Sequence, residues 1–140
     1  MIRLQNEGLI QPAPVLPAFA QQVSLAIQSW PEVTAATHWK LGNPTQVDGA
    51  EFHVPEGALG HIHLHGGGLH LALSKPLRNL LIERQLAQPF RWDAAWVERP
   101  IATAEDVEPA IWLFQLAYDR LRAAAPAALL ARIEARPAAT

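Results

Sequence analysis

The sequence predicts an α+β fold: a two-layer sandwich in which an antiparallel sheet of about four or five strands carries helices packed on one face. Three observations support this prediction. Several short strand-like runs follow one another directly, segments with helical apolar spacing lie before and after them, and strands and helices do not alternate as they do in parallel sheets. With 140 residues, we expect a single domain, 1–140, with about 1–15 and 136–140 loosely ordered.

The first two predicted elements are a helix and a strand. Pro17 suits the first turn of a helix, apolar residues follow it at helical spacing, and Pro31 ends the segment. Residues 33–39 alternate and contain β-branched side chains, which favours a strand. The segment 41–49, LGNPTQVDG, is rich in turn-forming residues and is expected to interrupt the sheet.

Three short strands are expected to form a meander in the middle of the chain. The runs AEFHV, LGHIHLH and LHLAL contain alternating apolar and polar residues, and the turn-forming sequences PEG and GGG separate them. The glycine run has neither the lysine nor the following helix of a phosphate-binding loop, so a hairpin turn explains it.

A helix and a further strand follow the meander. Residues 75–87 are expected to form a helix that Ser74 can cap, with its leucines facing inward. Residues 94–101 read as a strand, and Pro100 indicates that this strand lies at an edge or ends there.

The end of the chain predicts two helices. Thr103 and Asp106 resemble a capping box, and an apolar stripe continues from there to Leu121 at helical spacing. A short helix is expected within 126–140, before an Ala- and Pro-rich tail.

Composition limits the function classes. The chain has 11 basic and 13 acidic residues, a net charge of −2 and no basic cluster, so nucleic acid is not an expected partner. It has no cysteine, which excludes disulfides and thiolate chemistry and leaves metal binding to His, Asp and Glu. No segment approaches the roughly 20 apolar residues that span a bilayer. We therefore expect a soluble, cytoplasmic protein.

The segment 51–73 contains five of the six histidines of the chain. Alternate side chains of a strand share one face, so the polar positions of the three central strands lie opposite apolar ones such as Phe52, Ile62 and Leu71. If the apolar set packs under the helices, the other face of the sheet presents Glu51, His53, His61, His63, His65 and His70.

Three interpretations of this face remain open. It can be an exposed polar surface of an ordinary sheet. It can hold one divalent transition metal through His61, His63 and either His53 or Glu51. It can also be a metal-free small-molecule pocket in which His61, His63 and His53 act as catalytic bases or donors, and Glu51, His65, His70 and Trp96 contact the substrate.

Two of these residues have alternative roles. Glu51 either orients one of the histidines or is a solvated charge at the sheet edge. Trp96 lies on the strand face opposite Val97, so it either forms the aromatic wall of a pocket or belongs to a core.

Four motifs in order resemble the luciferase-domain family, which groups the fungal luciferase of the hispidin pathway with small, uncharacterised bacterial proteins. They are EFH, GHIHLHGGGLHLAL, AWV and EDVEPAIWLFQLAYDRL, and they cover roughly Glu51 to Leu121. The resemblance implies that the functional positions are Glu51, Phe52, His53, His61, His63, His70, Trp96 and Tyr118. It also implies an oxidoreductase activity, the addition of dioxygen to an enolic aromatic substrate without an organic cofactor.

The leading hypothesis is therefore a luciferase-like domain with a histidine-lined small-molecule pocket that oxygenates an enolic aromatic. The alternatives are a non-catalytic ligand-binding module, a histidine-based metal-binding protein, and an interaction domain whose histidine face docks a partner or forms a homodimer. A cupin-like metal barrel is disfavoured, because no Glu follows His63 at short range and the helices do not fit a barrel.

Overall fold

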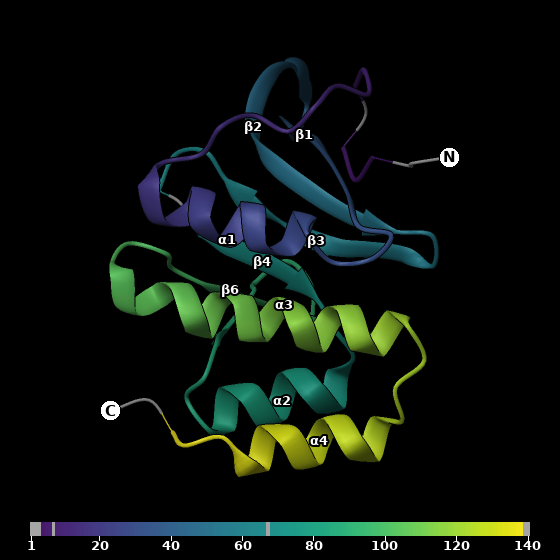
Figure 1. Ribbon diagram of the computed structural model, residues 1–140, viewed down its shortest axis with the longest axis vertical. Helices are drawn as coiled ribbons and strands as arrows, with labels where there is room; N and C mark the ends of the chain where they lie inside the picture. The colour runs from purple at the N-terminus through teal and green to yellow at the C-terminus, as the bar shows by residue number, and fades with distance from the viewer. Residues whose placement is uncertain (1–3, 7, 67, 139–140) are drawn as a thin grey trace.

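The computed structural model describes residues 4–6, 8–66 and 68–138. Within these residues, six strands form one sheet in the order β1-β2-β3-β4-β6-β5, and every neighbouring pair is antiparallel (Figure 1). The strands are β1 (Thr34–Lys40), β2 (Asn43–Val54), β3 (Gly57–His63), β4 (Leu69–Ala72), β5 (Gln88–Pro89) and β6 (Trp96–Arg99). The α+β class is confirmed, and the described part of the chain has one strand more than the upper predicted number.

The expected interruption at 41–49 is wrong for most of its length. β2 begins at Asn43 and pairs with β1 in a long hairpin. The turn is confined to Leu41 and Gly42, and Gly42 has a positive φ of 79° that glycine adopts without strain. The two-residue strand β5, which pairs with β6, was also not predicted, because so short a strand has no alternation to recognise.

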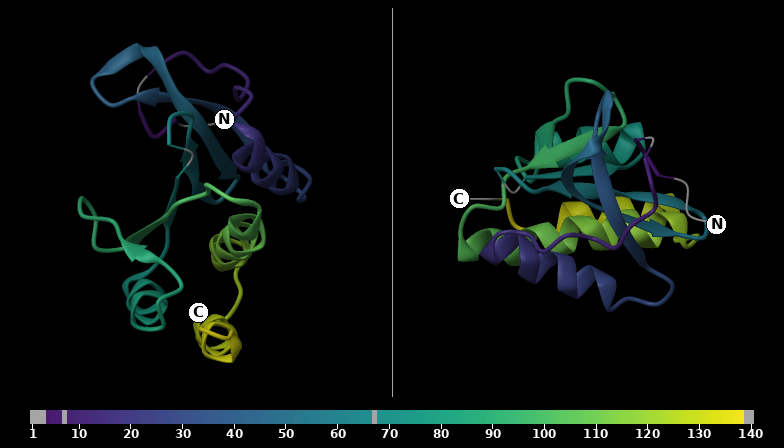
Figure 2. Two further views of the ribbon diagram at one scale, coloured as in Figure 1. Left: turned by 90° about the vertical axis from the view of Figure 1, so that its left-hand side faces the viewer. Right: turned by 90° about the horizontal axis from the view of Figure 1, so that it is seen from above.

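Helices cover one face of the sheet. The α-helices of the described residues are α1 (Ala18–Gln28), α2 (Lys75–Glu83), α3 (Val107–Leu121) and α4 (Pro126–Ala135). Helices α1 and α3 lie side by side in front of the strands in Figure 1, and the turned views of Figure 2 place them on the same side of the sheet. Helix α2 packs against β5, β6 and α4, and α4 also contacts α3. None of these helices has the length and apolar character needed to cross a bilayer.

The hydrophobic core lies between the sheet and the helices. Phe52, Ile62 and Leu71, predicted to face inward, are fully buried there, whereas Leu64, which follows the end of β3, is half-buried. Phe52 meets Phe114 of α3 edge to face at a centroid distance of 5.5 Å. Burial of such side chains stabilises the fold by about 1.5–3 kcal/mol each. The opposite face of the same strands is left for the polar side chains, as the alternation predicts.

A β-bulge in β3 controls which residues reach that polar face. Phe52 pairs with Gly60 but the next residue, His53, pairs with Ala58, so Leu59 is the extra residue. Leu59 is buried in the core, whereas His61, two positions later, lies on the opposite face. Gly60 makes this possible: its φ is 152°, and a Cβ atom there would lie 2.2 Å from the carbonyl oxygen of His70.

The N-terminal segment and the two hairpin ends complete the fold. Residues 9–12 run beside β1, where Trp39 donates to the Leu9 carbonyl and Thr37 donates to the carbonyls of Gln11 and Pro12. In the predicted glycine turn, His63 donates its backbone N–H to Gly68, and Gly67 lies outside the described residues. Of the ends that we expect to be loosely ordered, residues 1–3, 7, 139 and 140 also lie outside them.

The predicted start of the long C-terminal helix is present, with a short 3-10 turn (Ala104–Asp106) leading into α3. Asp106 accepts hydrogen bonds from the backbone N–H groups of Ala102 and Thr103 and from Arg99. Partial burial raises the pKa of Asp106, but these hydrogen bonds outweigh it and lower the pKa to about 2.

We predict that Asp106→Ala lowers the free energy of unfolding by about 1–2 kcal/mol at pH 7. The unfolded carboxyl has a pKa near 3.9, so the contribution of Asp106 is complete above that pH and is lost as pH falls through about 2. In urea unfolding, the difference in free energy of unfolding between the wild-type protein and Asp106→Ala should be smaller at pH 2.5 than at pH 7. Glu105→Ala, which removes the neighbouring exposed carboxylate, is the control, and an equal loss there would contradict the prediction.

Candidate functional site

Three histidines converge on the polar face of the sheet. Strand β3 contributes His61 and His63, and β4 contributes His70, which lies directly opposite His61 in the β3–β4 register. The Nδ1 atom of His70 lies 3.0 Å from Nε2 of His61 and 3.1 Å from Nε2 of His63. One ligand atom from each of these three residues lies within 4.8 Å of the other two, a spacing that suits a metal ion. We call His61, His63 and His70 the histidine triad.

Each member of the triad has a hydrogen-bond partner on its other ring nitrogen. Nδ1 of His63 lies 3.0 Å from Asp48, and Nε2 of His70 lies 3.0 Å from Glu98. Nδ1 of His61 lies 2.9 Å from the side-chain oxygen of Gln5. Because these oxygens accept hydrogen bonds, they place the ring protons on the outer nitrogens. The inner nitrogens that face one another then carry lone pairs.

The surroundings keep the triad uncharged. Burial, together with the neighbouring histidines, holds the pKa of His61 well below its usual value. Burial also lowers the pKa of His63, although Asp48 opposes it. For His70, burial and the nearby His63 lower the pKa against the opposing effect of Glu98. Neutral imidazole is the form that binds metals and accepts protons.

A second polar network lies beside the triad and is centred on Glu51. This fully buried carboxylate accepts hydrogen bonds from His38 at 2.9 Å, from His53 at 2.5 Å and from the backbone N–H of Gln5 at 3.1 Å. Burial raises the pKa of Glu51, but the hydrogen bonds from His38 and His53 outweigh it and lower the pKa. Two roles were considered for Glu51, and its contacts with His38 and His53 favour that of a carboxylate that orients histidines.

His38 joins the two networks. Its ring stacks on His61 at a centroid distance of 3.9 Å and an interplanar angle of 12°. In the β1–β2 register His38 is paired with Gly49, and Gly49 is also paired with His63 of β3. Because glycine has no side chain, nothing stands between the histidines of β1 and β3.

The triad forms part of a pocket of about 590 Å³. Aromatic side chains supply one wall: Trp96 lies 5.9 Å from the His61 ring and Phe90 lies 4.5 Å from the His70 ring, centroid to centroid. Trp92 also lines the pocket and is 74% exposed. Its remaining lining comes from Gln5, Asn6, His38, Leu41, Asp48, Ala58 and Asp93. The position of Trp96 is that of the pocket wall considered above, and not of the core.

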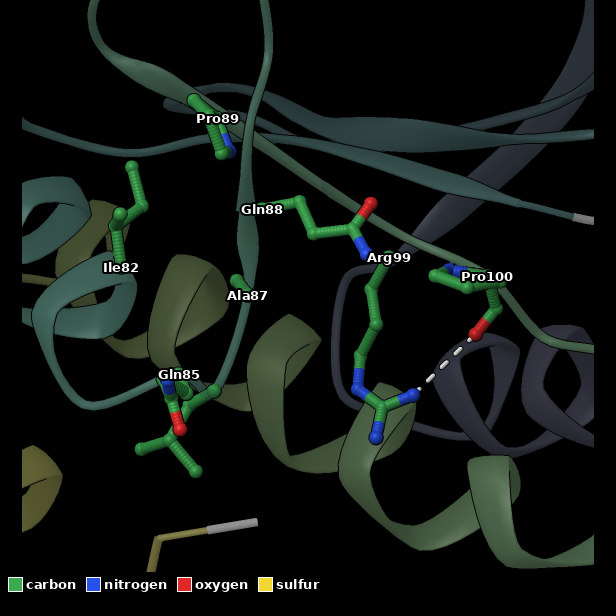
Figure 3. A pocket seen from close by; sticks show the side chains of 8 residues that line it. Ile82, Gln85, Ala87, Gln88, Pro89, Arg99 and Pro100 are labelled. Atoms are coloured by element: carbon green, nitrogen blue, oxygen red, sulfur yellow. Dashed lines mark hydrogen bonds between the residues drawn. The ribbon is translucent and has the colours of Figure 1, made fainter.

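A second hollow lies away from the histidines. It has a volume of about 380 Å³ and is formed beside β5 and α2 (Figure 3). The charged side chain in its lining, Arg99, is bound to the Pro100 carbonyl and to Asp106. The other polar side chains of the described lining are Gln85 and Gln88, and it contains none of the histidines and carboxylates that mark the first pocket.

The structure separates several predicted site residues from the triad. The expectation that His65 shares the histidine face is wrong, because β3 ends at His63 and His65 is exposed in the following turn. His53 contacts Glu51 and not the pair His61 and His63, because the bulge sets it opposite Ala58. His70 takes the place predicted for His53 in the candidate metal set.

The side chains of two residues implied by the family resemblance lie on the helix side of the sheet, away from the triad. Phe52 is a core residue, and Tyr118 of α3 donates to the Pro31 carbonyl and packs near Trp30. Neither lines the pocket of the triad.

Sequence reasoning missed several residues of the site, Gln5 among them, because its contacts lie far along the chain. Glu98 had a usable signal, because it shares a strand face with Trp96. His38 lies at an alternating position of β1 and was also detectable. Asp48 was hidden inside the segment expected to break the sheet, and the place of Phe90 depends on the unpredicted strand β5.

The fold and site define an α+β protein with a histidine-lined pocket on the face of its sheet opposite the helices. Comparison with protein families finds that residues 56–117 match the family described as the luciferase domain. The matched segment, which is less than half of the chain, contains the GHIHLHGGGLHLAL and AWV motifs that carry the resemblance to this family. Comparisons with curated proteins and with solved structures return no match.

Glu51 and Glu98, two of the carboxylates that contact histidines in the site, predict different costs of deletion. Glu51 is fully buried and satisfies three donors, whereas the Glu98 side chain is 40% exposed. In chelator-treated protein, Glu51→Ala should lower the free energy of unfolding by about 3 kcal/mol or more, and Glu98→Ala by less than about 1 kcal/mol. Urea unfolding of both variants checks this, and similar losses would show that Glu51 is not the buried hub described.

Proposed function

We propose that the pocket binds a flat aromatic molecule with an acidic, enolic hydroxyl group and that the protein adds dioxygen to it. The observation that carries this proposal is the presence, in one pocket, of aromatic walls and neutral imidazole nitrogens. Trp96 and Phe90 offer faces and edges against which a flat ring can pack. The luciferase-domain match supports the same class of chemistry.

The acidic hydroxyl is oriented toward the triad. His63 is the least buried of the three, and the Asp48 carboxylate on its Nδ1 leaves a lone pair on Nε2. A positioned neutral imidazole can take a proton from an enol, and the pairing with a carboxylate stabilises the imidazolium that forms. The histidine face therefore favours ligands that ionise by losing a hydroxyl proton.

The proposed reaction balances without a further reagent. The enolate gives electrons to dioxygen and a carbon–oxygen bond forms, while the proton that left the hydroxyl returns to the distal oxygen. The product is a hydroperoxide with the composition of the substrate plus one O₂. Dioxygen is the oxidant and the enolate is the reductant.

A non-catalytic binding module is the second candidate, and one observation favours it. The pocket is lined by Leu41 and Trp92, whose exposed fractions are 82% and 74%. Reactive anions are usually protected from water in enzyme sites, whereas a ligand sensor has no such requirement. Binding and turnover must therefore be measured separately.

We predict that the untagged, chelator-treated protein binds 4-hydroxy-2-pyrones about tenfold more tightly than their 4-methoxy ethers. The methyl ether cannot donate a proton to the triad, and a hydrogen bond to a charged partner contributes about 1.5 kcal/mol. Calorimetric titration of both compounds measures the difference. Trp96→Leu should weaken binding, and Trp112→Leu, which changes a tryptophan outside the pocket, should not.

Oxygen uptake by the protein with the tightest-binding compound then separates the two candidate functions. Uptake of one O₂ per substrate that is lost in His63→Ala supports oxygenation. Tight binding without uptake supports the binding module. Equal affinity for hydroxyl and methoxy compounds, with no effect of Trp96→Leu, would contradict the proposed pocket.

A further inference from the structure

In the triad, two ring nitrogens that face each other both lack a proton to donate. Asp48 and Glu98, when ionised, can only accept hydrogen bonds, so the His63 proton lies on Nδ1 and the His70 proton on Nε2. The two nitrogens that face each other, Nε2 of His63 and Nδ1 of His70, are then both without a proton. They lie 3.1 Å apart. Two lone pairs at that distance repel unless a cation lies between them.

His61, the third member, has the same arrangement of protons. The Gln5 side-chain oxygen faces Nδ1 of His61, which leaves Nε2 of His61 with its lone pair 3.0 Å from the same Nδ1 of His70. Three lone pairs thus point into one small region. A proton shared there would put a positive charge among buried or half-buried rings, whereas a metal ion can bond to all three nitrogens at once.

The distances suit a first-row transition metal. Bonds of 2.0–2.1 Å from such an ion to imidazole nitrogens separate neighbouring ligand nitrogens by about 3.0–3.4 Å. The separations of the His70 Nδ1 atom from Nε2 of His61 and from Nε2 of His63, 3.0 and 3.1 Å, lie in this range. Outer hydrogen bonds from ligand imidazoles to carboxylates or carbonyl-type oxygens are the usual second layer of a histidine metal site. Asp48, Glu98 and Gln5 provide one to each ligand.

We infer that His61, His63 and His70 bind one divalent first-row transition-metal ion, such as Zn²⁺, whose open coordination position faces the aromatic pocket. The inference shares its pocket with the proposed function and deepens it. In the metal-loaded protein His63 would serve as a ligand and not as a base, and the metal would supply a position for the enolate oxygen after the hydroxyl proton has passed to solvent. Metal binding itself requires no organic molecule, so it can hold or fail independently of the proposed substrate.

The test uses the full-length, untagged protein, freed of metal with a chelator and dialysed. Zn²⁺ is titrated calorimetrically, and Co²⁺ is titrated while its visible absorption, which depends on coordination, is recorded. We expect one ion per chain, a Co²⁺ spectrum with nitrogen coordination, and a higher melting temperature in the presence of Zn²⁺.

Variants distinguish the triad from the other histidines. Glu98→Ala, which removes an outer hydrogen bond, should weaken Zn²⁺ binding about 10–100-fold, and His70→Ala should weaken it more. His65→Ala is the matched control, because it removes an exposed histidine from the turn next to the triad and should leave the affinity unchanged. His53→Gln, which keeps a donor to Glu51, should also leave it unchanged.

Each outcome decides the inference. Circular dichroism of the metal-free variants confirms that each is folded. Failure of the folded wild-type protein to bind Zn²⁺ or Co²⁺ would overturn the inference, and so would binding that His65→Ala removes or that His70→Ala leaves intact. A wild-type protein that binds 4-hydroxy-2-pyrones but neither metal ion would refute the metal site alone. A wild-type protein that binds Zn²⁺ at the triad but does not bind the pyrones would refute the proposed ligand alone.

Discussion

The register of the central strands is the constraint on which the site depends. Glu51, His61, His70 and Glu98 are paired in turn across β2, β3, β4 and β6, so they form one row perpendicular to the strands. Neighbouring strands lie about 4.8 Å apart, which brings side chains in such a row within contact distance. A slip of one residue would send the histidines of a strand into the core. The buried residues of the core face hold the row in place.

The row also explains why so many polar groups tolerate partial burial. Its two ends are carboxylates, one fully buried at Glu51 and one partly exposed at Glu98. Between them, burial lowers the pKa of His61 and of His70, and their outer nitrogens find acceptors in Gln5 and Glu98. His63, which lies beside the row, finds its acceptor in Asp48. Buried polar groups are costly only when unpaired. In this network the inner nitrogens of the triad carry free lone pairs, so they are the atoms that can bind a metal ion or accept a proton.

Alternation along a single strand was sufficient to predict the polar face and the core beneath it. It identified His61, His63 and His70 on one side and Phe52, Ile62 and Leu71 on the other. It failed for His65, because the end of a strand depends on where the hairpin turns. It also could not select His70 over His53 as the third member. That choice depends on the bulge at Leu59 and on the pairing of β3 with β4, both of which are set by contacts between distant residues.

The hydrogen bonds of Gln5 have a consequence for the order in which the protein assembles. Gln5 contacts Glu51 through its backbone and His61 through its side chain, and these partners are 46 and 56 residues further along the chain. Contacts of such long sequence separation form only after much chain entropy has been lost. The three histidines of the triad lie on β3 and β4, which a short hairpin connects. Their hydrogen-bond partners include Glu98 of β6 and Gln5 of the N-terminal segment. A partly folded chain can therefore hold the histidines near one another before it can orient them, and only the completed fold presents all three inner nitrogens to a ligand.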